Sequence, residues 1–191
     1  MTAEEFINSL PDQVFIDNVT IGPMSDSPNW AEHVDAMRQR YIDQLSWFDN
    51  KDFSNMTLAD LDAGQGITTE YFRTKFKSVV AFESIAEYHE MARARFPEID
   101  IRHGSFDNKN YDMIVMIAPW GPTLFNSLVV NPNYLEDNCS VMIVDARESR
   151  FHAMNHQFWY RVVHSKIYPS LNQQRRFVVV QNRPLDIRVD I

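Results

Sequence analysis

The stretch Ala59-Asp60-Leu61-Asp62-Ala63-Gly64-Gln65-Gly66-Ile67-Thr68-Thr69 is the most informative segment of the chain. Its apolar start predicts a strand that ends at Asp62, and its last residues are typical of the first turn of a helix. Gly64 and Gly66 would let the backbone turn tightly between the two and approach a ligand closely. The free N–H groups of the helix start favour a polar or anionic ligand. Asp62 would accept hydrogen bonds from a cationic amino group.

A second acidic residue follows at an informative distance. Residues 78–83 are rich in β-formers and end in Glu83, about twenty residues after the glycine turn. In a βαβ unit this acid lies beside the first loop, where it can accept from both ribose hydroxyls of a nucleoside. The alternative is that Glu83 caps the next helix or ends its strand in solvent.

Strands and helices are expected to alternate from residue 57 onward. This alternation predicts βαβ units and a parallel, doubly wound sheet that binds ligands beyond the carboxyl ends of its strands. The expected strands are residues 57–62, 78–83, 99–103, 112–117 and 140–145. The expected helices are residues 68–76, 85–96, 123–130 and 147–161.

The two ends of the chain are expected to differ from this core. Residues 2–10 predict a short helix and residues 11–29 an irregular stretch. A longer helix follows, with Ser27 as its N-cap and Pro28 in its first turn. Its apolar face would hold Trp30, Val34, Met37, Tyr41, Leu45 and Phe48. Residues 162–168 and 176–181 are too close for a helical crossover, which predicts an antiparallel hairpin.

These elements together predict one α/β domain over residues 1–191. It is expected to be Rossmann-like and doubly wound, with a mostly parallel seven-stranded sheet that ends in the antiparallel hairpin. Residues 1–56 would form an N-terminal helical cap and residues 57–191 the core.

Over roughly residues 58–145 the sequence resembles class I S-adenosylmethionine-dependent methyltransferases. Asp62, Gly64 and Gly66 match the Asp/Glu-x-Gly-x-Gly motif of that family, although Thr68 stands where a third glycine is frequent. The resemblance implies that this loop holds the methionine part of the cofactor and that Glu83 holds the ribose. Residues 103–107 are similar to the adenine loop of the family, with Ser105 in place of a common acid. The implied cofactor-binding residues are Asp62, Gly64, Gly66, Glu83, Ser84, Ser105, Phe106 and Ala118.

Catalytic candidates come from the segments after the fourth and fifth strands. Residues 117–122 resemble the Asp-Pro-Pro-Trp loop of amino-methylating nucleic-acid enzymes, but Ile117 cannot accept a hydrogen bond from an amine. Trp120 would form either an aromatic wall or a core turn. On the helix predicted at 147–161, Glu148, His152 and His156 would share one face. That face could hold zinc or supply a histidine as general base, and a solvated surface is the alternative.

We expect no metal site of the catechol-methyltransferase type. Asp145 would match the second acid of such a site, but no acid ends the preceding strand. Cys139 is the only cysteine, so the chain forms no internal disulfide. Without a signal peptide or a membrane-length apolar run, a cytoplasmic protein is expected.

Charge gives a weaker indication of the acceptor. The formal net charge of −8 disfavours a broad nucleic-acid footprint, so a small-molecule acceptor is favoured and nucleic acid is left open. Residues 145–191 nevertheless hold 8 bases against 4 acids, and such a basic face could meet an anionic substrate. The oligomeric state is left open.

The sequence thus predicts a methyltransferase that uses S-adenosylmethionine and an unidentified acceptor. The first alternative is a methyltransferase-like protein without turnover, which binds the cofactor or a partner. The second is a nicotinamide-dependent oxidoreductase. It is disfavoured because its third motif glycine would fall at Thr69 and because the chain has no second domain for a hydride acceptor.

Overall fold

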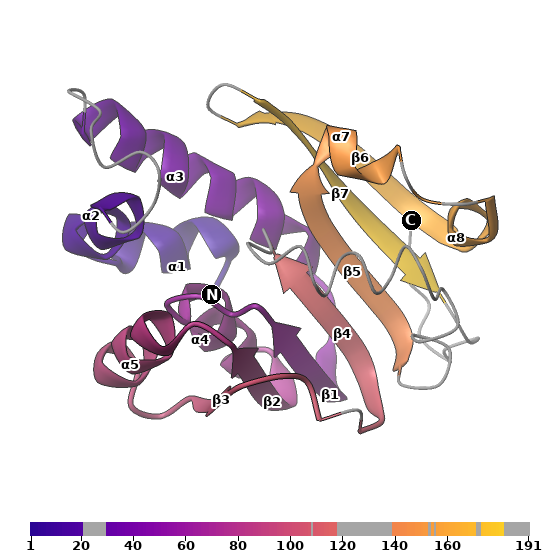
Figure 1. Cartoon of the computed structure of the whole chain (residues 1–191), viewed down its shortest axis with the longest axis horizontal. Helices are drawn as coiled ribbons and strands as arrows, with labels where there is room; N and C mark the ends of the chain where they lie inside the picture. The colour runs from indigo at the N-terminus through magenta and orange to yellow at the C-terminus, as the bar shows by residue number, and fades with distance from the viewer. Residues whose placement is uncertain are drawn as a thin grey trace. The chain divides into compact units, whose positions relative to one another are not determined.

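The structure is a computed structural model that describes residues 1–20, 30–107, 109–117, 139–152, 154, 156–170 and 173–181. Its helices are α1 (Ala3–Ser9), α2 (Asp12–Thr20), α3 (Trp30–Leu45), the 3-10 turn η1 (Ser46–Phe48), α4 (Ile67–Arg73), α5 (Ala86–Arg95), α7 (Glu148–Phe151) and α8 (His156–Tyr160). Its strands are β1 (Phe53–Leu61), β2 (Phe76–Glu83), β3 (Asp100–His103), β4 (Tyr111–Ile117), β5 (Cys139–Arg147), β6 (Val162–Ser170) and β7 (Gln173–Gln181) (Figure 1).

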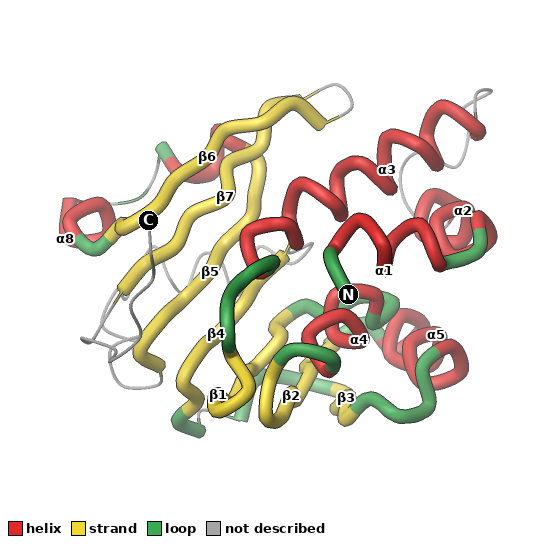
Figure 2. Tube along the Cα trace, turned by 180° about the vertical axis from the view of Figure 1, so that it is seen from behind, coloured by secondary structure: helices red, strands yellow, loops and turns green. Residues whose placement is uncertain are grey.

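The seven strands form one sheet in the order β3-β2-β1-β4-β5-β7-β6. Figure 2 shows the strands side by side in this order. Strands β1 to β5 pair in parallel, and β7 pairs antiparallel with β5. From β1 the chain proceeds outward to β2 and β3 and then returns to β4 on the other side of β1. This confirms the predicted Rossmann-like, doubly wound fold. The direction of winding reverses between β1 and β4, which is the point where such sheets bind ligands.

Apolar side chains alternate between the two faces of the sheet. Ala59 and Leu61 of β1 point to one face, where they pack in the same cluster as residues of α7 and α8. Ala81 of β2 points to the other face and packs against Ala92 of α5. The first cluster contains Ala59, Leu61, Phe82, Phe106, Ile114, Met116, Cys139, Met142, Val144, Ala146, Phe151, Met154, Phe158, Val178 and Val180. Burial on both faces explains the long apolar runs of the central strands.

The chain divides into two compact units, residues Met1–Lys51 with Tyr168–Gln174 and residues Asp52–Ile167 with Arg175–Ile191. The expected single domain with a cap over residues 1–56 stays a prediction. In the first unit, Thr2 caps α1 with its hydroxyl, and Glu5 completes a capping box. Arg38 of α3 donates to the carbonyl oxygens of Ile7 and Leu10 at the end of α1.

Two local predictions are wrong. Residues 11–29 were expected to be irregular, but Asp12–Thr20 is helix α2 because Val14 and Phe15 bury their side chains. Residues 147–161 were expected to form one helix, but the chain forms α7 and α8 instead. Phe151 and Phe158 both pack into the sheet, so two short helices satisfy the same apolar spacing. The N-cap Ser27, Pro28 and the expected helix at 123–130 lie outside the described residues.

Several strands are longer than the sequence predicts. β1 begins at Phe53 and β5 ends at Arg147, because neighbouring strands continue to pair with them. In the described part of the chain, no helix has the length and apolarity that a membrane span requires.

Candidate cofactor site

The glycine turn follows β1 and uses left-handed backbone conformations. Asp62, Gly64 and Gly66 have φ angles of 56°, 57° and 80°. The turn is fastened to β2 because the N–H of Ala63 donates to the carbonyl oxygen of Phe82 at 3.2 Å. A Cβ atom at Gly64 would meet no described atom within 4 Å. The backbone at Gly64 is therefore open to close approach, as the sequence predicts for a ligand loop.

Gly66 has a different local role. It lies at the N-cap of α4, and a Cβ there would come within 2.8 Å of Ile99 Cδ1 and 3.1 Å of Ala92 Cβ. The missing side chain thus allows close packing of the turn on α5 and on the segment before β3. This packing explains the glycine by itself, and the cofactor role assigned to Gly66 stays a prediction.

Glu83 ends β2 and joins the two loops that the sequence singles out. One carboxylate oxygen accepts from the N–H of Gly64 and the other from the N–H of Ile85, each at 2.7 Å. The residue is only 3% exposed. A carboxylate has about four acceptor positions, so two remain after these bonds. The structure therefore brings Glu83 to the glycine turn, with acceptor capacity left for hydroxyl groups.

Asp60 is a buried acid in the middle of β1, to which the sequence reasoning gave no role. Its Oδ2 accepts from the hydroxyls of Thr68 and Thr69 of α4, at 2.8 and 2.7 Å. Its Oδ1 has no hydrogen-bond partner among the described residues. Burial raises the pKa of Asp60 to about 7, and the charges of Glu83 and Asp62 act in the same direction, against the two threonine bonds. The bonds fasten the start of α4 to β1.

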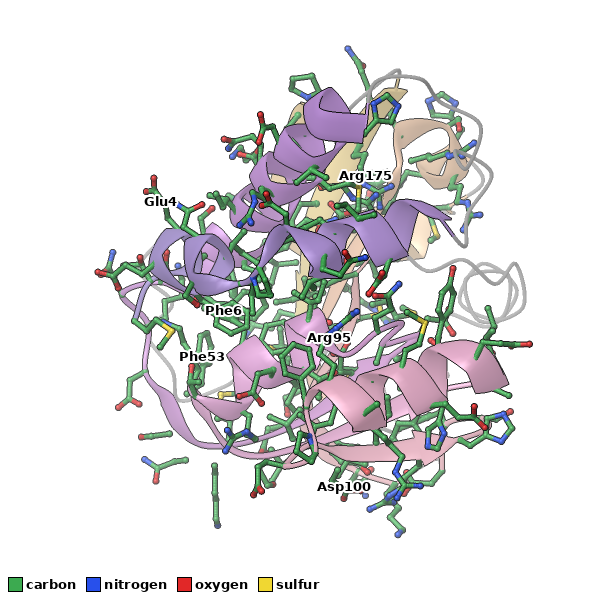
Figure 3. The ribbon with its side chains drawn as sticks, turned by 90° about the vertical axis from the view of Figure 1, so that its left-hand side faces the viewer. Glu4, Phe6, Phe53, Arg95, Asp100 and Arg175 are labelled. Carbon is green, nitrogen blue, oxygen red and sulfur yellow. The ribbon has the colours of Figure 1, made fainter. Side chains whose placement is uncertain are left out.

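The sequence contains a signal for the contact between Asp60 and the two threonines. An acid between the apolar residues Ala59 and Leu61 points to the opposite face of the strand, where a following helix must supply its partners. A second contact was also missed, since Arg95 of α5 (labelled in Figure 3) donates to the side-chain oxygen of Gln65 in the glycine turn. Nothing in the spacing of the two residues indicates that bond.

The expected adenine side lies at the ends of β2 and β3. Ser84 and Ser105 are both exposed there, and the N–H of Gly104 donates to the carbonyl oxygen of Glu83 at 2.9 Å. Ile85 exposes 38% of its surface directly after Glu83, which is unusual for a large apolar side chain. Phe106, in contrast, is buried and packs edge-on against Phe82, with ring centroids 5.5 Å apart. Its expected contact with adenine stays a prediction.

The structure describes only some of the catalytic candidates. Trp120 lies outside the described residues, as does Ala118, which was expected to bind the cofactor. Glu148 of α7 binds Arg176 of β7, and the charge of His152 also acts on its carboxylate. His152 directly follows α7 and is exposed, whereas His156 begins α8 and its side chain lies outside the described part. The predicted face of Glu148, His152 and His156 on a single helix is therefore wrong.

No family model matches the sequence, and no curated protein matches it. Solved structures do match. A protein from Thermoplasma acidophilum aligns with a TM-score of 0.59 at 13% identity, over 96% of this chain and 97% of its own. A proposed RNA methyltransferase from Pyrococcus horikoshii aligns with a TM-score of 0.56 at 15% identity, over 78% of this chain and 84% of its own. The chain has the class I methyltransferase fold.

A further methyltransferase structure agrees with this assignment. A ribosomal protein methylase from Lactobacillus delbrueckii aligns with a TM-score of 0.57 at 14% identity, over 78% of this chain and 80% of its own. Identities this low show the fold alone. The methyltransferase fold nevertheless places the glycine turn and Glu83 at the carboxyl ends of β1 and β2, where the sequence pattern expects the cofactor.

Proposed function

We propose that the chain is a methyltransferase that uses S-adenosylmethionine. The observation that carries the proposal is the bond between the Glu83 carboxylate and the N–H of Gly64, at a turn whose backbone is open. This bond sets a ribose-binding acid beside a loop that a ligand can approach. It lies at the carboxyl ends of β1 and β2, beside the place where the winding of the sheet reverses.

The residues of the site fit the parts of this cofactor. Glu83 has acceptor positions left for the two ribose hydroxyls. Asp62 follows β1 and would attract the amino group of the methionine part, and the exposed Ile85 would cover the adenine. When bound, the sulfonium supplies an already activated methyl group. The protein then needs mainly to align an acceptor with it, and a base is required only when the acceptor must lose a proton.

The acceptor that we propose is RNA. The small-molecule expectation rested on net charge alone, whereas three methyltransferases of similar fold act, by their names, on RNA, tRNA or a ribosomal protein. The net charge of −8 still disfavours a broad footprint. An RNA acceptor that contacts the protein only near the cofactor is compatible with the net charge and with the substrates of these methyltransferases.

Calorimetry with S-adenosylmethionine, S-adenosylhomocysteine and NADH tests the cofactor. The two sulfur nucleosides should bind and NADH should not. Glu83→Gln should weaken nucleoside binding at least tenfold, because charged hydrogen bonds contribute about 1.5–3 kcal/mol each. Gly64→Val should abolish it by blocking approach. Glu90→Ala, which removes an exposed acid from α5, is the matched control and should bind as the wild type does.

The outcomes separate the alternatives. Binding of NADH alone would favour an oxidoreductase and contradict the proposal. Wild-type affinity in both Glu83→Gln and Gly64→Val would show that this turn is not the site. Cofactor binding without methyl transfer to any RNA, protein or small acceptor would favour the alternative of a methyltransferase-like protein that binds the cofactor without catalysis. Thermal melting of each variant checks that a lost affinity is not a loss of folding.

A further inference from the structure

Asp60 is a buried acid that uses only one of its two oxygens. The residue is 1% exposed, and its Oδ2 accepts from the hydroxyls of Thr68 and Thr69. Its Oδ1 has no hydrogen-bond partner in the described part of the chain. A buried carboxylate that is only half satisfied is costly to keep ionised, because it has lost its hydration without gaining equal bonds. The geometry therefore favours the protonated form of Asp60.

Asp60 lies on the same face of the sheet as Glu83. Asp60 of β1 pairs in parallel with Ala81 of β2, and Glu83 stands two residues beyond Ala81. Paired residues of parallel strands point to one face, and so do residues two apart in a strand. A strand spacing of about 4.8 Å and a rise of about 3.3 Å per residue place the two acids roughly 8 Å apart. On its other side, Asp60 pairs with the apolar Val115 of β4.

The environment of Asp60 holds its protonation in balance near neutral pH. Burial raises the pKa of Asp60 to about 7, against the two threonine bonds, which lower it. The charges of Glu83 and Asp62 raise the pKa further. At pH 7 the carboxyl group is consequently divided between its protonated and ionised forms. A change in the charge nearby shifts this division.

The cations of the two helices on this face are not bonded to Asp60. Arg73 of α4 binds Glu70 of the same helix at 2.8 Å. Arg95 of α5 donates to a glutamine of the glycine turn, and Arg93 of α5 is exposed. Among the described residues, no cation forms a hydrogen bond or an ion pair with Asp60. A positive ligand at the glycine turn would therefore supply the opposite charge that the ionised form of Asp60 lacks.

We propose that Asp60 releases its proton when a positively charged cofactor binds, and that it thereby helps the site to distinguish S-adenosylmethionine from S-adenosylhomocysteine. The inference rests on the proposed function. The two nucleosides differ by the methyl group and the positive charge of the sulfonium. The proton of the carboxyl group passes to the buffer, and a carboxylate is left behind Gly64 and Glu83. Asp60 acts through its charge, because it is buried behind the residues assigned to the cofactor.

The pH dependence of the affinity gives the size of the effect. A ligand that favours the ionised form of a group binds more tightly as the pH rises through the pKa of that group. If binding lowers the pKa of Asp60 from about 7 by about 1, the affinity should rise about fourfold between pH 6 and pH 7.5. A unit charge at roughly 10 Å changes a pKa by about this much at an effective dielectric constant of about 20.

Calorimetry with both nucleosides at pH 6 and pH 7.5 tests the inference. The affinity for S-adenosylmethionine relative to S-adenosylhomocysteine should rise about fourfold in the wild type and stay constant in Asp60→Asn, which cannot ionise. Comparison with the variant also cancels the titration of the amino groups of the nucleosides. Buffers of different ionisation enthalpy report the protons released. At pH 7 the wild type should release about 0.4 proton more than Asp60→Asn on binding S-adenosylmethionine.

Thr68→Val gives a test that does not depend on the asparagine variant. It removes one hydrogen bond to the ionised carboxylate, so the pKa of Asp60 should rise and the increase in relative affinity should begin at a higher pH. The matched control is Asp112→Asn. It removes a half-buried carboxylate that binds Thr57 near the start of β4, and it should keep the wild-type pH dependence. Thermal melting checks that each variant is folded.

The outcomes keep this inference apart from the proposed function. If both nucleosides bind with a relative affinity that does not change with pH, or that changes equally in Asp60→Asn, the role of Asp60 is overturned and the methyltransferase proposal stands. If neither nucleoside binds, both proposals fall. Should Asp60→Asn not fold, the proton release of the wild type with each nucleoside and the pH dependence of Thr68→Val decide. Equal proton release with the two nucleosides would then overturn the inference.

Discussion

Replacement of Asp60 by asparagine should change how stability depends on pH. Asp60 is 1% exposed, and burial raises the pKa of its carboxyl group from 3.8 to about 7. The folded protein therefore holds this proton more tightly than the unfolded chain does. The resulting stabilisation is complete below about pH 3.8, decreases as the pH rises, and is absent above about pH 7. Asparagine has a similar shape, can still bind the threonine hydroxyls, and does not titrate.

The size of this stability change follows from the raised pKa of Asp60. A rise from 3.8 to about 7 corresponds to about 4 kcal/mol between the fully protonated and fully ionised limits. Between pH 5 and pH 8 the contribution of Asp60 should fall by roughly 3 kcal/mol. The Asp60→Asn variant does not lose this stability, because asparagine does not ionise. The stability of the variant relative to the wild type should therefore rise by that amount over the interval, whatever its value at pH 5.

Urea denaturation at several values between pH 5 and pH 8 measures the difference. Comparing the two proteins at each pH removes the contributions of titrating groups that do not interact with Asp60. Asp112→Asn is the control for the loss of an aspartate–threonine bond, because Asp112 is a half-buried strand residue that accepts from the hydroxyl of Thr57 at 2.9 Å. A constant free-energy difference between Asp60→Asn and the wild type from pH 5 to pH 8 would refute the reasoning.

Three further changes probe the packing of the fold by denaturation. Gly66→Ala should cost more stability than Gly64→Ala. Both place a side chain at positive φ for about 1–2 kcal/mol, but only the first also meets Ile99 Cδ1 at 2.8 Å and Ala92 Cβ at 3.1 Å; equal losses would contradict this. Arg175→Leu should destabilise by about 3–5 kcal/mol through the buried Asp145, and adding Asp145→Leu should recover most of the loss. Thr2→Ala should cost about 1 kcal/mol by removing the helix cap, with the cofactor affinity unchanged.

The fold could be predicted because the strands carry strong local signals. The runs that became β1, β2, β4 and β5 are apolar on both faces, and breakers separate them from amphipathic segments. The segment from residue 147 to 161 failed because helical spacing of apolar residues does not show where a helix is interrupted. Phe151 and Phe158 are both buried in the sheet cluster, and their spacing of seven residues fits one continuous helix as well as two short ones.

The contact between Gly64 and Glu83 could be predicted from the sequence. Gly64 follows the first strand of a βαβ unit and Glu83 ends the second. Because these two strands are neighbours, a separation of about twenty residues predicts that the two residues meet. The ion pair between Arg175 and Asp145, in contrast, depends on the pairing of β7 with β5. That pairing is a property of the whole sheet, and no local pattern in the sequence contains it.

The contact between Asp60 and Thr68 bears on the threonine that stands where the resembled methyltransferases often have a third glycine. In the family that the sequence resembles, a third glycine is frequent at the position of Thr68. Here the Thr68 hydroxyl binds the buried carboxyl group of Asp60 on β1. A hydrogen bond thus joins the start of α4 to that strand. The bond fixes α4 against β1 directly behind Gly64 and Gly66, so the left-handed turn is held from the interior while the backbone of Gly64 stays open.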